Sequence, residues 1–513
     1  MLNSNETTYA IELKNISKIF GSVVANDNIN LNIKYGEILA LLGENGSGKT
    51  TLMNMLSGIY YPDAGTISIA GKEVTISSPN DAIEFGIGMI HQHFKLVEVF
   101  SAMDNIVLGT KENYQNSKVL KERILEISNK FGLEVEPGKK IYNMSVSEKQ
   151  TVEIIKVLYR GAQILILDEP TAVLTPQETE KLFLILRKMK KQGCAIIIIT
   201  HKLHEVLEIS DRVSILRKGQ LIDTVKTSDS NENHLTELMV GKPVSLKIDR
   251  PIINDKNKNA ILEVVDLTVD DEYEIEALKN VSFELKTGEI LGVAGIANSG
   301  QKELCESIAG LVNVKNGLVL CNKENIIGKT PDEIINLGIN MSFVPEDRLG
   351  MGLVGSMGIV ENIMLKSYKK KSGFFIDKKP ARKLSEELVK KLSIVTPNID
   401  TPVRMMSGGN VQKVLLGREI ESNPNILITA YPVRGLDINS SYMIYDLLNE
   451  QKKKGVAILF IGEDLDVLLE LSDRIMVLCH GEMKGIVKTQ EITKKELGLM
   501  MAGSNLKGVD QYE

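Results

Sequence analysis

The chain has 513 residues, of which 43% are hydrophobic and 25% are charged. This composition is that of a folded globular protein, and the length exceeds that of one typical domain, so at least two hydrophobic cores are expected. The formal net charge of −6 argues against a sequence-independent nucleic-acid binder, which normally carries a basic surplus.

The cysteines and the apolar runs favour a cytosolic protein without a membrane span of its own. Cys194, Cys305, Cys321 and Cys479 are scattered and form no CxxC pair, which favours buried, reduced thiols. The first residues lack the basic region and apolar core of a signal peptide. Apolar runs such as 195–199 are too short to span a bilayer. We expect partners to supply any membrane-spanning part.

The first strongly patterned stretch is a glycine-rich loop over residues 43–51. It follows the apolar run 38–42 and precedes residues 52–56, which have helical spacing. A phosphate-binding loop requires this strand–loop–helix order, because its glycines let backbone N–H groups turn inward and the helix N-terminus adds partial positive charge. The residues expected to contact a nucleotide are Gly43, Asn45, Gly46, Ser47, Gly48, Lys49, Thr50 and Thr51.

Two of these side chains have a distinct expected role. Lys49 would neutralise the β- and γ-phosphates, and the Thr50 hydroxyl would ligate Mg²⁺. The pattern therefore predicts that the chain binds a nucleoside triphosphate.

Acidic residues and a histidine follow apolar runs further along the chain. Asp168-Glu169 comes directly after the run 164–167, and His201 follows the run 195–199 after one threonine. A carboxylate at a strand end can hold the Mg²⁺ shell and a second can polarise the attacking water, so we assign Asp168 to the metal and Glu169 to the water. His201 could contact a γ-phosphate or orient the water. Near-continuous apolar runs are typical of parallel strands buried on both faces, which predicts an α/β core.

The second half of the chain repeats the first. Residues 36–39 recur as residues 288–291, and Ser210-Asp211-Arg212 recurs as Ser472-Asp473-Arg474. Such self-similarity indicates two homologous domains rather than one large one.

The repeat predicts the domain boundaries. We expect a first α/β domain over residues 8–241 and a second over residues 260–502. Between them, residues 242–259 contain two prolines and many polar side chains without apolar periodicity, which is typical of a linker. Segments 95–160 and 350–420 read as mostly helical, one inserted subdomain in each copy.

The order of these motifs resembles that of the ATP-binding subunits of ABC transporters, over roughly residues 8–500. The resemblance rests on the glycine loop, Gln92, the segment Ser145-Val146-Ser147-Glu148, the segment Asp168-Glu169-Pro170-Thr171, and His201. It implies two tandem ABC-type nucleotide-binding domains, each with a RecA-like core, an antiparallel β subdomain and a helical subdomain. It also implies that Gln92 reaches the metal and the water while reporting to a membrane subunit, and that Phe20 stacks on adenine.

The resemblance further implies composite sites, in which the glycine loop of each domain is closed by the serine–glycine signature of the opposite domain. The first copy has Ser145-Val146-Ser147 at its signature, where a side chain at either glycine position would hinder close approach of a phosphate. The intact signature is in the second copy, at Ser407, Gly408 and Gly409. The intact loop and the intact signature would therefore meet in one active site.

The second copy has lost its other catalytic groups. Its loop, residues 295–300, is followed by Gln301 in place of the lysine, and Lys302 is one residue out of register. The positions of the two acids, the glutamine and the histidine are taken in turn by Ala430, Tyr431, Glu346 and Glu463. We predict no hydrolysis and at most weak nucleotide binding at this site.

Fused twin ATPases of this length resemble those of bacterial importers for sugars and nucleosides. The phrases His91-Gln92-His93-Phe94 and Thr171–Pro176 are similar to the nucleoside branch, with monosaccharides such as ribose or galactose as the alternative cargo. The implied cofactors are ATP and Mg²⁺. The implied partners are transmembrane permease subunits and, indirectly, an extracellular substrate-binding lipoprotein. The implied location is peripheral, on the cytoplasmic face of the cell membrane.

Two other classes of function compete with transport. A soluble tandem ATPase of this superfamily could act on ribosomes or DNA, but those that resemble translation factors carry a long charged linker, and the linker here is short. The net charge of −6 and the lack of a CxxC…CxxC zinc pattern also weigh against it. The other class is a nucleotide-gated scaffold that binds ATP without hydrolysing it. The complete set of catalytic groups from Lys49 to His201 argues against this class.

Overall fold

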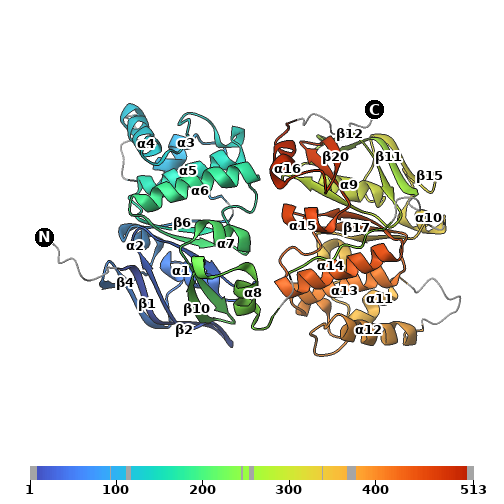
Figure 1. Ribbon diagram of the computed structural model, residues 1–513, viewed down its shortest axis with the longest axis horizontal. Coiled ribbons are helices and arrows are strands. Elements are labelled where there is room, and N and C mark those ends of the chain that lie inside the picture. The colour runs from blue at the N-terminus through green and yellow to red at the C-terminus, as the bar shows by residue number, and fades with distance from the viewer. Residues whose placement is uncertain are drawn as a thin grey trace. The chain divides into compact units, whose positions relative to one another are not determined.

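The structure is a computed structural model that describes residues 9–92, 94–110, 117–243, 246–253, 259–337, 339–366 and 377–504. The chain divides into two compact units, Met1–Ser245 and Leu246–Glu513 (Figure 1). Among the described residues, each unit contains a six-stranded and a four-stranded sheet. The repeat found in the sequence is therefore a repeat of the fold.

The first unit is organised around its six-stranded sheet, in which five neighbouring strands are parallel and β10 is antiparallel. In spatial order the strands are β10 (Gln220–Lys226), β9 (Arg212–Arg217), β3 (Ile38–Leu42), β8 (Ala195–Ile199), β7 (Ile164–Asp168) and β6 (Ile87–Ile90). Every residue of β3 and of β8 is buried. Alternate residues of β8 belong to different hydrophobic clusters, Ile196 and Ile198 to one, Ile197 and Ile199 to the other. The sheet is thus covered on both faces, which explains its unbroken apolar runs.

The remaining elements of the first unit form an antiparallel sheet and the helices. The antiparallel strands are β2 (Val23–Lys34), β1 (Tyr9–Phe20), β4 (Ala64–Ile69) and β5 (Lys72–Val74). The helices are α1 (Lys49–Leu56), α2 (Pro79–Glu84), α3 (Ala102–Val107), α4 (Ser117–Phe131), α5 (Val146–Tyr159), α6 (Pro176–Lys191), α7 (Leu203–Ile209) and α8 (Glu232–Val240), with 3₁₀ turns η1 (Ile141–Asn143) and η2 (Thr227–Asp229).

Helix α6 shows how local sequence sets these elements. Thr175 caps its N-terminus in a capping box with Glu178, and Pro176 occupies the first helical position, where no N–H is needed. Its buried residues recur three or four positions apart, at Leu182, Phe183, Leu186 and Met189. The helix therefore packs one apolar face on the core.

The second unit has the same topology. Its six-stranded sheet contains β20 (Glu482–Lys488), β19 (Arg474–Cys479), β13 (Ile290–Gly295), β18 (Ala457–Ile461), β17 (Ile426–Ala430) and β16 (Met341–Val344). Its antiparallel sheet contains β12 (Glu276–Lys286), β11 (Ala260–Asp270), β14 (Asn316–Cys321) and β15 (Glu324–Asn325). The strand order matches that of the first unit element for element, which confirms the predicted fold class of two α/β domains.

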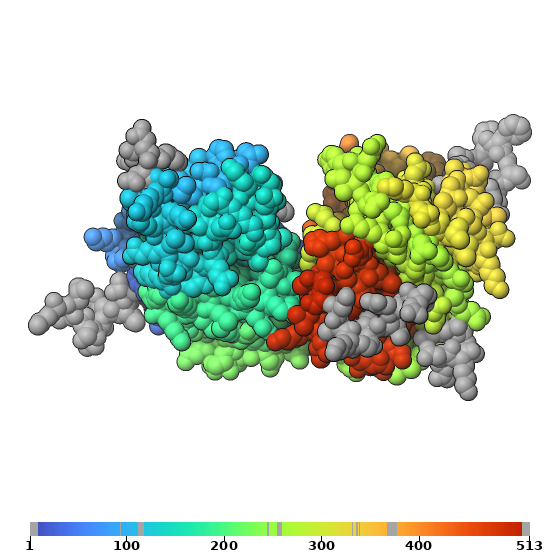
Figure 2. Space-filling view, turned by 90° about the horizontal axis from the view of Figure 1, so that it is seen from above, coloured from blue at the N-terminus to red at the C-terminus, as the bar shows by residue number. Residues whose placement is uncertain are grey.

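The helices of the second unit lie on its sheet and in its helical subdomain. They are α9 (Gln301–Ile308), α10 (Pro331–Asn336), α11 (Ile359–Met364), α12 (Lys379–Lys391), α13 (Gly408–Glu421), α14 (Ile438–Lys453), α15 (Leu465–Leu471) and α16 (Lys494–Met501), with the π-helix η4 (Arg348–Gly352) and the 3₁₀ turn η6 (Val403–Met405). In the space-filling view, the red surface belongs to the C-terminal part of the described chain, which includes α16 (Figure 2). No helix in the described part of the chain is both long enough and apolar enough to cross a membrane.

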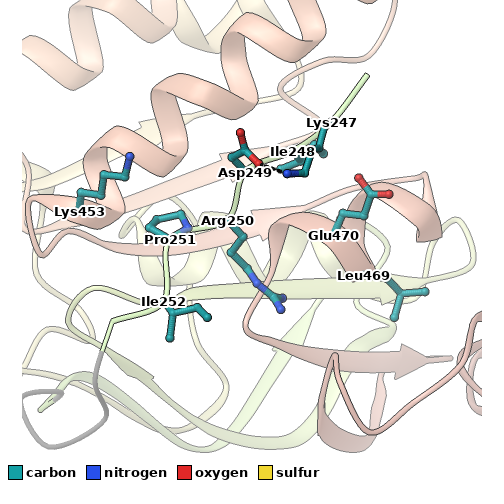
Figure 3. Close-up of a pocket in the computed structure, with 9 residues that line it drawn as sticks. All are labelled: Lys247, Ile248, Asp249, Arg250, Pro251, Ile252, Lys453, Leu469 and Glu470. Atoms are coloured by element: carbon teal, nitrogen blue, oxygen red, sulfur yellow. Dashed lines mark ion pairs between the residues drawn. The ribbon is translucent and has the colours of Figure 1, made fainter. Parts of the chain in front are cut away.

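Part of the segment expected to be a linker packs on the second unit. Ile248 is buried in the core of that unit, and the Arg250 guanidinium donates to the carbonyl oxygen of Ser472 and, at 2.6 Å, to the hydroxyl of Thr489. A pocket beside this segment is lined by Lys247, Ile248, Asp249, Arg250, Pro251, Ile252, Lys453, Leu469 and Glu470 (Figure 3). Residues 246–253 are therefore anchored rather than free, while 244–245 and 254–258 lie outside the described residues.

Candidate nucleotide site

The glycine loop of the first unit connects β3 to α1, as the sequence predicts. Gly48 caps the N-terminus of α1 with a φ of 100°, a conformation that favours glycine. A Cβ atom there would lie 2.3 Å from the carbonyl oxygen of Ala25, and one at Gly43 would lie 2.3 Å from that of Leu216. The loop can therefore follow this path only with glycine at these two positions.

Lys49 is held inside this loop. Its Nζ atom donates to the carbonyl oxygens of Gly43, at 2.7 Å, and of Glu44, at 2.9 Å, and the residue is only 9% exposed. Burial lowers the pKa of Lys49, and the negative charges of Glu169 and Asp168 partly offset this effect. The fold thus brings the loop lysine close to the two acids, which lie far from it in the sequence.

The two acids lie at the carboxyl end of strand β7, which is separated from β3 by β8. Asp168 is its last residue, and burial, together with the charge of Glu169, raises the pKa of Asp168. Glu169 has a left-handed backbone with a φ of 46°, and its N–H donates to the carbonyl oxygen of Ile199 at 2.8 Å. This turn directs consecutive carboxylates into different surroundings, so they can serve different roles.

The Glu169 carboxylate joins the predicted glutamine and histidine. Gln92 Nε2 donates to one of its oxygens at 2.8 Å, and His201 Nδ1 lies 3.0 Å from the other. The pKa of Glu169 is lowered, and the hydrogen bond with His201 is the main cause. The three residues follow β6, β7 and β8, whose carboxyl ends meet at one edge of the sheet. Three separate sequence predictions therefore form one cluster around an acceptor carboxylate.

The turn after Glu169 is fixed by side chains from two helices. Gln150 of α5 donates to the carbonyl oxygen of Pro170 at 2.8 Å. The Thr171 hydroxyl donates to Glu205 of α7 at 2.6 Å, and Lys202 donates to the carbonyl oxygen of Thr171 at 3.1 Å. These contacts hold the backbone that positions the acid. Sequence reasoning missed them, because Gln150, Lys202 and Glu205 belong to none of the motifs recognised in the sequence.

Phe20 lies at the end of β1 and is 42% exposed, so its ring is accessible to a base. The ring of Tyr60 meets it edge to face with centroids 5.2 Å apart, and Lys18 Nζ lies 5.5 Å from its centroid. Tyr60 was not predicted. Its edge-to-face contact helps to fix the orientation of the Phe20 ring.

The two signature segments differ in how they are held. In the first unit, Ser145 caps α5 in a capping box with Glu148, and Glu148 forms a 2.6 Å ion pair with Lys139. In the second unit, Ser407 precedes α13 without capping it, and its hydroxyl oxygen accepts from Asn410 at 2.9 Å. The Ser145 hydroxyl therefore caps a backbone N–H of its own helix, whereas the Ser407 hydroxyl contacts the Asn410 side chain instead.

The loop of the second unit is filled by its own glutamine. The Gln301 side chain, 3% exposed, accepts from the N–H of Ser299 and donates to the carbonyl oxygen of Ile296, both at 3.0 Å. It thereby occupies a backbone N–H of the kind that cradles phosphate in an intact loop. Lys302 is exposed, and among the described residues no contact of its side chain supports a role as substitute for the missing lysine.

These features define the first unit as a P-loop nucleotide-binding domain and the second as a degenerate copy of it. The family model described as ABC transporter matches residues 26–172 and 278–432, one segment in each unit. The chain therefore belongs to the ABC transporter family, and its ATP-binding relatives identify it as an ABC-type ATPase.

Curated relatives match over nearly the whole chain. The nucleoside import ATP-binding protein NupA of Lactococcus lactis is 42% identical and the match covers 98% of this chain and 99% of that protein. The guanosine import ATP-binding protein NupO of Bacillus subtilis is 44% identical, with 97% and 98% covered. The ribose import ATP-binding protein RbsA of Clostridium tetani is 37% identical, with 95% and 96% covered.

Proposed function

We propose that this chain is the ATP-hydrolysing motor subunit of a membrane importer and that nucleosides are its cargo. The observation that carries the motor role is the cluster of Gln92, Glu169 and His201 beside the loop that holds Lys49. An ionised glutamate with a histidine neighbour can polarise and orient a water for attack on the γ-phosphate. The nucleoside and guanosine importers among the relatives support the cargo.

The proposed active site combines residues of both copies. Lys49 and the loop residues hold the phosphates, Phe20 stacks on adenine, and Ser407, Gly408 and Gly409 close the site. The distribution of the motifs supports this pairing. The first copy has the intact loop and an altered signature, whereas the second copy has an altered loop and the intact signature. The N-terminus of α13 would add partial positive charge to the γ-phosphate.

The residues of the first unit suit Mg²⁺, which prefers oxygen ligands and usually retains water and nucleotide phosphates in its shell. Burial and the charge of Glu169 raise the pKa of the partly buried Asp168 carboxylate, and a bound cation would oppose both effects. Thr50 and Gln92 supply further oxygens. No group of three or more acidic, histidine or cysteine side chains that could hold a metal occurs among the described residues. We therefore propose Asp168, Thr50 and Gln92 as its ligands, with ATP providing others.

We propose that ATP binding closes the two halves, because the signature contacts the γ-phosphate only in the closed state. Glu169 then positions the water, Lys49 offsets charge on the phosphates, and loss of the γ-phosphate permits reopening. Transmembrane permease subunits would receive this motion at the cytoplasmic face of the membrane, where the chain would lie peripherally. A substrate-binding lipoprotein outside the cell would deliver the cargo to them.

Uptake by the native host tests this proposal. In cells whose only copy carries Lys49→Ala, uptake of labelled nucleosides is expected to disappear, while uptake of ribose and galactose persists. Lys302→Ala, at the exposed lysine of the filled loop, is the matched control and should retain uptake. Loss of ribose or galactose uptake alone would replace nucleosides by monosaccharides as the cargo. Unchanged uptake of all three, with the chain co-sedimenting with ribosomes, would refute the transport role.

A further inference from the structure

The second unit contains a charged cluster where the first unit has its catalytic one. Arg434 forms ion pairs with Glu346 and with Glu463, the latter at 3.1 Å, and its guanidinium lies 5.8 Å from the ring centroid of Tyr431. Glu346 and Glu463 take the positions of Gln92 and His201. In the first unit a central anion joins two neutral or basic groups. In the second, a central cation joins two acids.

This cluster extends to the signature of the same unit. The Arg348 guanidinium donates to the carbonyl oxygen of Arg434 and, at 3.3 Å, to that of Gly408. The other end of η4 is also tied to α13, because Arg418 donates to the carbonyl oxygen of Gly352 at 2.6 Å. A continuous chain of contacts therefore leads from Glu463, through the two arginines, to the signature turn at residues 407–409.

In the part of the first copy that the structure describes, no such chain of contacts is present. Phe94 and Ala172 take the positions of Arg348 and Arg434. The first signature has instead its local capping box, in which Glu148 accepts from the N–H of Ser145 at 2.8 Å. The second copy has Asn410 at the position of Glu148, and its Ser407 makes no such cap. The turn that lacks the capping box is thus the one that the arginines reach.

We propose that Arg348, itself held by Arg434 and its two glutamates, is a positioning residue that fixes the Ser407–Gly409 turn. In this role the ion cluster links the loops that follow β16, β17 and β18 to the signature turn of the second unit. The inference rests on the proposed function, because the position of this turn matters for turnover only if it completes the intact site.

The test measures ATP hydrolysis and ATP binding by the full chain carrying Arg348→Met. This substitution keeps the apolar stem of the side chain but removes the guanidinium N–H donors. We expect kcat to fall about tenfold, the effect of losing charged hydrogen bonds that position a reacting group. Equilibrium binding of a fluorescent ATP analogue should change little, since Lys49 and Phe20 remain. Arg348→Lys keeps a charged donor and should recover part of kcat.

Two further variants separate positioning from general destabilisation. Arg382→Ala, which removes a half-exposed 2.8 Å ion pair with Asp400 in the same unit, should leave kcat unchanged. Arg434→Met should lower kcat less than Arg348→Met, and the double variant should be no worse than Arg348→Met, because both act through one chain of contacts. Multiplicative losses in the double variant, or equal loss in Arg382→Ala, would overturn the proposal.

The inference and the proposed function fail differently. If the wild-type chain hydrolyses ATP, Lys49→Ala does not, and Arg348→Met matches the wild type, only the positioning role is refuted. If Lys49→Ala hydrolyses ATP like the wild type, the proposed site itself is refuted.

Discussion

Glu169 and Tyr431 share one backbone conformation, with φ values of 46° and 50°, although one is an acid and the other an aromatic residue. Their N–H groups donate to the carbonyl oxygens of Ile199 and Ile461, at 2.8 and 3.0 Å. Because a positive φ disfavours most side chains, its presence in both copies shows that the turn is set by the strands beside it. The second unit has kept the scaffold of the site while its side chains have changed.

Glu169→Gln should remove turnover without removing ATP binding. The amide keeps the shape of the side chain but cannot accept a proton, so kcat should fall about a hundredfold or more, as for loss of a general base. Hydrolysis and binding of a labelled ATP analogue by the purified chain check this. Tyr431→Phe, at the matching backbone position, is the control and should behave as the wild type. Substantial turnover by Glu169→Gln would mean that another group activates the water.

Lys49→Ala should abolish both nucleotide binding and hydrolysis, because Lys49 is the buried cation of the first loop. Lys302→Ala should retain nearly all activity, since Lys302 is exposed and Gln301 fills the second loop. Isothermal titration with ATP and a phosphate-release assay measure the two quantities. Strong loss in Lys302→Ala would show that the second loop takes part in nucleotide binding.

The two signature serines should respond in opposite ways. Ser145→Ala removes a helix cap and should lower the free energy of unfolding by about 1 kcal/mol, with little effect on kcat. Ser407 makes no cap, so Ser407→Ala should leave the unfolding free energy nearly unchanged and reduce kcat at least about tenfold. Urea denaturation and steady-state hydrolysis distinguish the two effects. Equal loss of activity in both variants would contradict the asymmetric pairing.

Gln301→Ala should destabilise the second unit without loss of ATP hydrolysis. It leaves the N–H of Ser299 and the carbonyl of Ile296 without their present partner, at a cost of about 1–3 kcal/mol in unfolding free energy. Thermal unfolding with and without ATP measures this. The companion variant Gln301→Lys should not double the rate, because Ala430 and Tyr431 still replace the acids. A doubled rate would mean that the lysine alone is missing.

Local patterns sufficed for much of the fold and for the prediction of candidate site residues. The loop at residues 43–51, the repeat and the buried strands are all read from short stretches, because glycine conformation and apolar periodicity are local properties. The contrast between Ser407-Gly408-Gly409 and its first-copy counterpart is also visible in the sequence alone. The sequence also shows substitutions such as Gln301 in place of the loop lysine. It indicates only that the lysine is missing, not which groups the glutamine contacts instead.

Contacts between distant segments required the tertiary structure. Glu169 meets Gln92 and His201, 77 and 32 residues away, only because parallel strands bring their carboxyl ends together. Arg434 pairs with Glu346, 88 residues away, for the same reason. Residues that the sequence shows only as replacements of catalytic groups therefore form a charged cluster with its own contacts. The sequence by itself determined which residues are available for chemistry. The packing of the sheet decided which of them meet, because side-chain contacts depend on distances that no local pattern encodes.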